Sequence, residues 1–208
     1  MIIYTVITNA YDTLKEPKVV TPGWRYVCFS DAPIQSKVWE FIEIENTPGI
    51  DRRIKIRAHD YFDSKVNIYV DGSFLIIGNL NDFISKIETT FSLSLHRRCD
   101  CIYEEAEALL NKNMIDPLVW KSQKERYQLE GFPEELGMGR NGILIRDLSD
   151  PEVLDINERW WNEYVSGVKR DQLSLMYCFW KVGRRPNLQP PIEFRNYFKL
   201  KKHNVHRG

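Results

Sequence analysis

The sequence has no excess of charge of either sign and no apolar run that approaches the length of a membrane span. Its 208 residues include 29 Lys and Arg against 29 Asp and Glu, a balance that argues against a broad nucleic-acid or anionic-membrane surface. Met1 leads directly into a strand-like segment rather than into a signal peptide. We therefore expect no nucleic-acid partner, no membrane span and a cytoplasmic location.

Cysteine is also scarce, with four residues at Cys28, Cys99, Cys101 and Cys178. Only Cys99 and Cys101 are close in sequence, and a C-x-C pair lacks the usual zinc or redox spacing. Cys28 and Cys178 lie among aromatic and aliphatic residues, where a free cysteine behaves as a small hydrophobe. The pattern predicts reduced thiols and gives little support for a zinc site.

Strand-like and helix-like segments alternate along the chain. Strands are predicted at 2–7, 24–29, 39–45, 66–70, 74–77, 91–95 and 142–146, and helices at 51–62, 79–87, 101–111, 117–129, 157–164 and 171–181. Residues 131–142 contain one proline and four glycines and are predicted to form a mobile loop or lid. This alternation indicates one α/β domain with a mixed, mainly parallel sheet.

Asp71 ends the apolar run 66–70 and is followed by Gly72 and Ser73. A buried strand that stops at Asp-Gly places a carboxylate at the carboxyl end of a sheet, where open α/β sheets bind ligands. Carboxylate oxygen suits Mg²⁺ or Mn²⁺, and these ions in turn hold nucleotide phosphates. The alternative is an ordinary Asp-Gly turn that joins two strands.

Two basic clusters are candidates for phosphate binding. On a helix, Arg52, Lys55 and His59 would share one face and line a diphosphate pocket, or they would form a solvated basic face. His96, Arg97 and Arg98 directly follow a predicted strand. At a strand end these three groups would bind phosphates or a sugar.

Asp171 and Gln172 stand where the chain becomes apolar and helical. Asp171 is there either a helix N-cap or, with Gln172, a pair that orients sugar hydroxyls and stabilises positive charge at an anomeric carbon. The basic tail contains His203 and His206, which are candidates to complete a metal site with Asp71. A frayed tail is the alternative for these two histidines.

Several motifs occur together in an order that resembles a known family. They include Cys28-Phe29-Ser30-Asp31, Val70-Asp71-Gly72, Ile145-Arg146, Trp160-Trp161-Asn162-Glu163 and Arg170-Asp171-Gln172-Leu173-Ser174. The family is glycosyltransferase-like and occurs in plant Golgi proteins linked to cell-wall and mucilage polysaccharide, in bacteria and in large algal viruses. The resemblance covers nearly the whole chain, from Tyr4 to about Phe179.

The resemblance implies a GT-A fold, a nucleotide-binding α/β sandwich with helices on both faces of the sheet. A nucleotide-binding part would span about residues 1–100 and an acceptor-side part about residues 101–208. Asp71 would then bind the metal, and Asp171 with Gln172 would face the transferred sugar.

The resemblance also implies a nucleoside site formed by the loop from Thr8 to Tyr11 together with Asp31, with Tyr11 stacking on the base. Two positions depart from the family pattern. Ser73 replaces the usual second acid of the metal motif, and Leu148 follows Asp147 where plant relatives have a histidine after the acid.

We therefore predict a metal-dependent glycosyltransferase that uses Mn²⁺ or Mg²⁺. It would move a hexose or deoxyhexose from a nucleotide-diphosphate sugar, a UDP-sugar above all, to a glycan hydroxyl, with retention at the anomeric carbon. One alternative, favoured by Ser73, is a catalytically degenerate carbohydrate-binding module of the same fold. Another is a metal-dependent phosphoesterase that uses Asp71 with His59 or His96.

Overall fold

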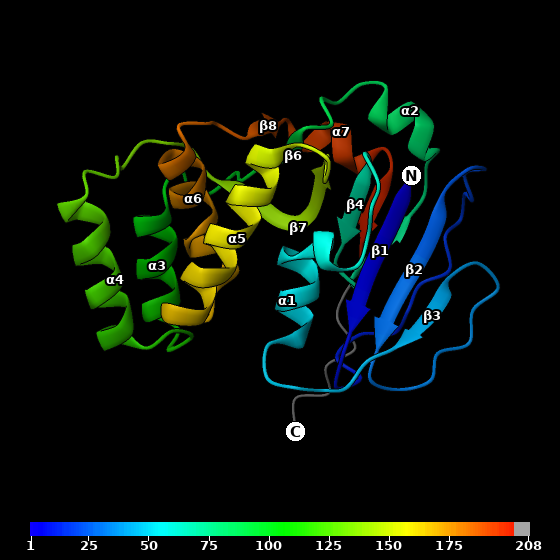
Figure 1. Cartoon of the computed structure of the whole chain (residues 1–208), viewed down its shortest axis with the longest axis horizontal. Helices are drawn as coiled ribbons and strands as arrows, with labels where there is room; N and C mark the ends of the chain where they lie inside the picture. The colour runs from blue at the N-terminus through cyan, green and yellow to red at the C-terminus, as the bar shows by residue number, and fades with distance from the viewer. Residues whose placement is uncertain (202–208) are drawn as a thin grey trace.

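A computed structural model describes residues 1–201 and contains a seven-stranded sheet and a two-stranded sheet (Figure 1). The large sheet has the order β3-β2-β1-β4-β7-β6-β8, and the small one pairs β5 with β9. The strands are β1 Ile2–Ile7, β2 Arg25–Ser30, β3 Glu40–Glu43, β4 Asn67–Val70, β5 Phe74–Ile76, β6 Phe91–Leu95, β7 Gly139–Arg146, β8 Asn187–Gln189 and β9 Phe198–Leu200.

Helices follow or separate most of these strands. The α-helices are α1 Ile50–Ile56, α2 Leu80–Ile84, α3 Ile102–Leu110, α4 Pro117–Leu129, α5 Pro151–Ser166, α6 Leu175–Val182 and α7 Pro191–Arg195. Two 3₁₀ helices, η1 Ala58–Asp60 and η2 Asp171–Leu173, follow α1 and precede α6. Within residues 1–201, none of the helices has the length and apolar character needed to cross a membrane.

The large sheet is mixed and mainly parallel, as the alternation of segments predicts. β1 runs parallel to β2 and β4, and β2 runs parallel to β3, whereas β7 is antiparallel to both of its neighbours, β4 and β6. All six residues of β1 are buried, because a parallel strand covered on both faces has no solvent side.

Helices cover both faces of this sheet. Alternate residues of β1 point to opposite faces, so Tyr4 packs in one core cluster with Ile54 of α1 and Trp160 of α5. Ile3 packs in the other cluster with Phe83 of α2, and this cluster also includes residues from the last part of the described chain. Figure 1 shows α2 and α7 together, apart from α3 to α6. The predicted α/β class with helices on both faces is therefore confirmed.

Several predicted elements have other bounds in the structure, among them one helix and one loop near the candidate ligand edge. The helix predicted at 51–62 stops at Ile56, because Arg57 leaves the helical region at φ −94° and ψ 47° and a separate 3₁₀ turn follows. Asp51, where the predicted helix begins, lies inside α1, whose cap position is Gly49. The loop predicted at 131–142 ends early, since residues 139–142 already belong to β7.

The segment after Gly183 contains β8, α7 and β9, none of which was predicted. Pro190 and Pro191 mark the start of α7 rather than an irregular tail, because proline fits the first helical turn. β9 pairs with the distant strand β5, a contact that local sequence patterns do not reveal.

Candidate functional site

Asp71 directly follows the carboxyl end of β4. Its backbone N–H donates to the carbonyl of Gly142, with 2.9 Å between N and O, and the hydroxyl of Tyr69 donates to its Oδ1 at 2.6 Å. The Asp71 side chain is 37% exposed. It is therefore oriented by the neighbouring strands and still open to a ligand.

An Asp-Gly turn is present, but it does not form a hairpin. The N–H of Phe74 donates to the carbonyl of Asp71 at 2.9 Å, as in a β-turn. The strand that follows, β5, pairs with β9 in the second sheet and not with β4. The turn thus moves the chain from one sheet to another and leaves Asp71 at the open edge.

Gly72 brings this turn against the loop after β1. A Cβ atom at Gly72 would lie 3.1 Å from the Cβ of Asp12 and 3.2 Å from Cγ1 of Ile7. β1 and β4 are parallel neighbours, so their carboxyl ends meet at one edge of the sheet. Glycine permits the close approach of the two loops there.

Two cavities meet at Asp71. The smaller, of about 440 Å³, includes Thr8, Tyr11, Arg52 and Gly72 in its lining. The larger, of about 680 Å³, includes Ser73, His96, Asn141 and Gln172. Asp71 lines both. A ligand that passes from one cavity to the other would pass its carboxylate.

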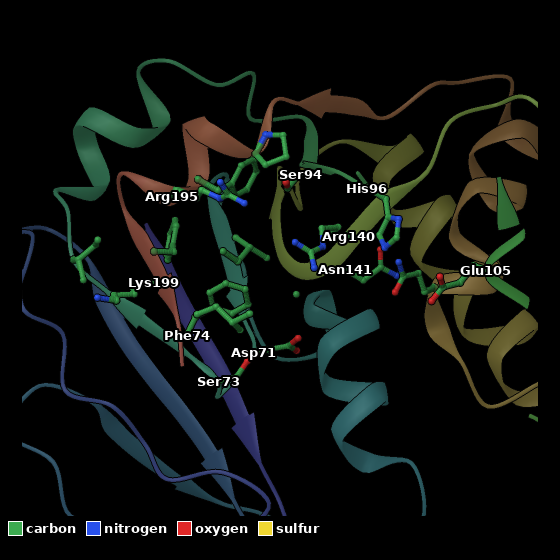
Figure 2. Close-up of a pocket in the computed structure, with 18 residues that line it drawn as sticks. Asp71, Ser73, Phe74, Ser94, His96, Glu105, Arg140, Asn141, Arg195 and Lys199 are labelled. Atoms are coloured by element: carbon green, nitrogen blue, oxygen red, sulfur yellow. The ribbon is translucent and has the colours of Figure 1, made fainter. Parts of the chain in front are cut away.

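Figure 2 shows how side chains surround the larger cavity. Arg195 and Lys199 lie on one side, and His96 and Glu105 lie on the other, with Asp71 between and below them. Phe198 of β9 adds an apolar surface to the lining. The cavity therefore joins charged and apolar groups contributed by segments that are distant in sequence.

Lys55 connects Asp71 to Asp171. Its Nζ lies 2.8 Å from Oδ2 of Asp171 and 3.8 Å from Oδ1 of Asp71, while the Lys55 side chain is only 4% exposed. The ammonium group also lies 4.9 Å from the ring centroid of Tyr69. Lys55 is part of the site, but it acts as a buried link between two carboxylates and lines neither cavity.

Asp171 is buried and remains ionised. Burial by itself raises the pKa of this carboxyl, but the charges of Lys55 and Arg52 outweigh that effect and lower the pKa to about 2. The Nδ2 group of Asn141 donates to Oδ2 of Asp171 at 3.4 Å, and Nε1 of Trp160 donates to its backbone carbonyl at 2.7 Å. Asp171 is therefore a fixed negative charge near neutral pH.

The N-cap interpretation of Asp171 is wrong. Asp171 is the first residue of η2, whose cap position is Arg170, and α6 is preceded by Ser174. Gln172 turns toward the larger cavity, where its Nε2 donates to the carbonyl of Gly139 at 3.2 Å. Asp171 therefore contacts Lys55 and Arg52, whereas the neighbouring Gln172 lines the larger cavity.

Arg52 forms an ion pair with Asp171, as Lys55 does, and it also lines the smaller cavity. Its Nε lies 3.5 Å from Oδ1 of Asp171, and its Nη1 donates to Asp51 at 2.6 Å. Burial opposes the charge of Arg52, but the nearby carboxylates prevail and raise its pKa. Arg52 therefore offers a permanent positive charge beside Asp71.

His59 does not join Arg52 and Lys55, contrary to the prediction. The helix ends before His59, and its Nε2 lies 2.9 Å from Oε1 of Glu158 on α5. The phosphoesterase pair of Asp71 with His59 is therefore not assembled. Asp31 also lies outside the two cavities, where its Oδ2 accepts a hydrogen bond of 2.9 Å from the backbone N–H of Asn9 and so supports the loop after β1.

The basic cluster after β6 is only partly brought to the site. His96 lines the larger cavity, whereas Arg97 and Arg98 are exposed and line neither cavity. His203 and His206 lie outside the described residues, so their predicted place beside Asp71 stays a prediction.

Sequence reasoning missed three polar residues of the site. Asn141 contacts Asp171, although the sequence predicts a mobile loop there, and Tyr69 donates to Asp71, although it belongs to a predicted apolar strand. Asp12 lines the smaller cavity. The signal for Asp12 was its position after Tyr11, directly beyond a buried strand, whereas nothing local marked the role of Asn141.

The described residues do not by themselves assemble a metal site. Residues 1–201 contain no group of three or more His, Cys, Asp or Glu side chains placed to hold an ion. Asp71 supplies one carboxylate, and its Oδ1 already accepts from Tyr69 and faces Lys55. A metal held by Asp71 would therefore need further ligands besides the His, Cys, Asp and Glu side chains of the described residues.

The structure is that of an α/β protein with two adjoining cavities, and hence a candidate ligand site, at the carboxyl edge of its sheet. The sequence model of a family described as "TOD1/MUCI70, glycosyltransferase-like domain" matches residues 38–203. The chain belongs to this family of glycosyltransferase-like domains.

A solved structure of the galactosyltransferase LgtC, in complex with donor and acceptor sugar analogues, is similar to this chain. The identity is 13%, the match covers 85% of this chain and 70% of that one, and the TM-score is 0.46. A search of curated proteins finds no match.

Proposed function

We propose that the protein transfers a hexose or deoxyhexose from a nucleotide-diphosphate sugar, most simply a UDP-sugar, to a glycan hydroxyl with retention at the anomeric carbon. The observation that carries the proposal is the position of Asp71 between two cavities, in a chain of a glycosyltransferase-like family. A nucleotide sugar has a matching shape, since its diphosphate lies between a nucleoside and a sugar.

In this arrangement the nucleoside occupies the smaller cavity. Thr8 and Tyr11 line it, and the exposed ring of Tyr11 offers a face for base stacking. Arg52 lies beside Asp71 and supplies positive charge to the diphosphate. Because the departing nucleotide gathers negative charge, a fixed cation at this point favours the transition state.

The sugar and the acceptor then share the larger cavity, where Gln172 and Asn141 offer amide groups to hydroxyls. Asp171 stays ionised through its contacts with Lys55 and Arg52. A carboxylate in this state cannot donate a proton, and Asp171 lines neither cavity. Its proposed role is therefore electrostatic, in that its fixed charge favours positive charge that develops at the anomeric carbon. The departing phosphate oxygen would accept the proton of the acceptor hydroxyl.

Metal dependence is part of the proposal. A bound Mn²⁺ or Mg²⁺ supplies Lewis-acid neutralisation of the leaving diphosphate. Asp71 would be its ligand from the described part of the chain, and His203 and His206 are candidates outside it. Within residues 1–201 no group of three or more His, Cys, Asp or Glu side chains completes this donor set.

The test is a turnover assay across nucleotide sugars with Mn²⁺, combined with calorimetric titration of UDP. Asp71→Ala is expected to abolish turnover and weaken UDP binding, and EDTA is expected to stop turnover reversibly. Asp63→Ala is the control, because Asp63 is exposed and lines neither cavity. No turnover and no UDP binding by the wild type would contradict the proposal.

The carbohydrate-binding alternative is favoured by one observation. Ser73 stands where the family has a second acid, and it is buried in the wall of the larger cavity. A binding module would bind glycans with no turnover, and Asp71→Ala would leave that binding intact. The same titrations with a glycan therefore separate the two functions.

A further inference from the structure

The last turn of α1 is held by a fully buried arginine. Arg146 of β7 has no exposed surface, and it donates from Nη1 to the carbonyl of Ile56 at 2.9 Å and from Nη2 to the carbonyl of Lys55 at 2.6 Å. The hydroxyl of Tyr4 donates to the same Lys55 carbonyl at 3.0 Å and accepts from Nη2 of Arg146 at 2.6 Å. Two side chains from the central sheet thus meet at one backbone carbonyl.

Burying the charged guanidinium of Arg146 costs free energy, because the group loses its hydration. Burial lowers the pKa of Arg146, although a guanidinium stays protonated in proteins. Its other side-chain partner is the Oδ1 of Asn157, at 3.0 Å. The final carbonyls of a helix carry partial negative charge and have no partners within the helix, so they compensate the cation in place of a carboxylate.

The residue held in this way is the one that links the two carboxylates of the site. Lys55 leaves the same turn of α1, and its Nζ reaches Asp171 and Asp71. Its backbone carbonyl accepts hydrogen bonds from Arg146 and Tyr4, and its side chain lies between the carboxylates of Asp71 and Asp171. A shift of the turn would therefore move the ammonium group relative to both carboxylates.

We propose that Arg146 and Tyr4 are positioning residues for sugar transfer, which fix the ammonium group of Lys55 between Asp71 and Asp171 by holding the Lys55 carbonyl. The inference rests on the proposed function for its kinetic part, whereas its geometric part is independent of turnover. Neither residue lines a cavity, so both act through Lys55. Displacement of a reacting constellation by about 1 Å can lower a rate about a hundredfold.

The test compares Tyr4→Phe with Tyr26→Phe. Each change removes one buried hydroxyl and keeps the ring, but Tyr26 lies in the other core cluster, where its hydroxyl accepts from the N–H of Thr21 at 2.9 Å. Two readouts are measured, namely the NMR signal of the Lys55 ammonium group, assigned with Lys55→Met, and kcat with KM for the donor. Arg146→Lys keeps the charge but loses the two-pronged contact with the carbonyls.

Tyr4→Phe and Arg146→Lys are expected to shift or broaden the Lys55 signal and to lower kcat about tenfold or more, with KM for the donor nearly unchanged. Tyr26→Phe should lower the melting temperature comparably and leave both readouts near wild type. An unchanged Lys55 signal in Tyr4→Phe, or an equal loss of kcat in Tyr26→Phe, would overturn the inference. A wild type without turnover would refute the proposed function, and the NMR comparison would still decide the positioning.

Discussion

The two carboxylates of the site have opposite surroundings, although one lysine contacts both. The side chain of Asp71 is 37% exposed and accepts a hydrogen bond from neutral Tyr69. The Asp171 side chain is 10% exposed and is enclosed by Lys55, Arg52 and Asn141. The contrast separates a carboxylate available to a ligand from one whose charge the protein has already fixed.

The largest effect should follow from removing the shared cation. Lys55→Met leaves Asp171 buried with only Arg52 to compensate its charge, so the free energy of unfolding should fall by about 3 kcal/mol. Arg52→Met is the comparison, because its side chain is 32% exposed and its contact with Asp171 is longer. Chemical denaturation of both variants measures the difference. An equal loss of unfolding free energy would show that Lys55 compensates the charge of Asp171 no more than Arg52 does.

Neutralising each carboxylate in turn should break the comparison directly. Asp171→Asn should lower the free energy of unfolding by about 2 kcal/mol, because the buried Lys55 loses its nearest anion. Asp71→Asn should cost less than about 1 kcal/mol, since exposed ion pairs contribute little. UDP binding should respond in the reverse order, with the greater loss in Asp71→Asn. Calorimetry and denaturation on the same samples test both halves.

Acid should remove the contribution of Asp171 in a defined range of pH. Its pKa is lowered from 3.8 to about 2, so the stability that it adds is complete well above pH 4 and is lost as pH falls through about 4 to about 2. The free energy of unfolding of the wild type should therefore fall by about 2 kcal/mol more than that of Asp171→Asn over this range. Parallel curves for the two proteins would contradict the assigned charge state.

The smallest effects should distinguish the two cavities beside Asp71. A Cβ at Gly72 would press on Asp12 and Ile7, and one at Gly142 would lie 3.0 Å from Cε2 of Phe74 and 3.1 Å from Oδ2 of Asp71. Each alanine variant should lose about 1 kcal/mol of stability through overpacking. Gly72→Ala should weaken UDP binding more than Gly142→Ala, which should act on the acceptor. Equal effects on UDP would mean that the cavities are not functionally separate.

Sequence patterns predicted the parts of the site that depend on local order. The bounds of β1, β6 and α4 agree with the prediction, and Asp71 lies at the carboxyl end of a buried strand as expected. In these segments the apolar pattern and the element end coincide. The position of Asp71 directly after β4 follows from that coincidence.

The remaining parts depend on contacts between distant segments. Nothing near Lys55 in sequence shows that its side chain contacts Asp171. Likewise, the carbonyls of Lys55 and Ile56 at the end of α1 accept hydrogen bonds from Arg146 of the distant strand β7. The wall formed by β9 likewise requires pairing with β5. Helical spacing placed His59 beside Lys55 because it assumed that the helix continued.

The crossing from β4 into a second sheet has a practical consequence for anyone who trims this chain. Phe198 and Leu200 of β9 form part of the wall of the larger cavity, and Lys201 donates from its backbone to the carbonyl of Ser73 at 2.8 Å. Cutting the chain before Phe198 would strip β5 of its only described strand neighbour and open that wall beside Asp71. β9 is thus an integral part of the larger cavity, which cannot keep its shape without this strand.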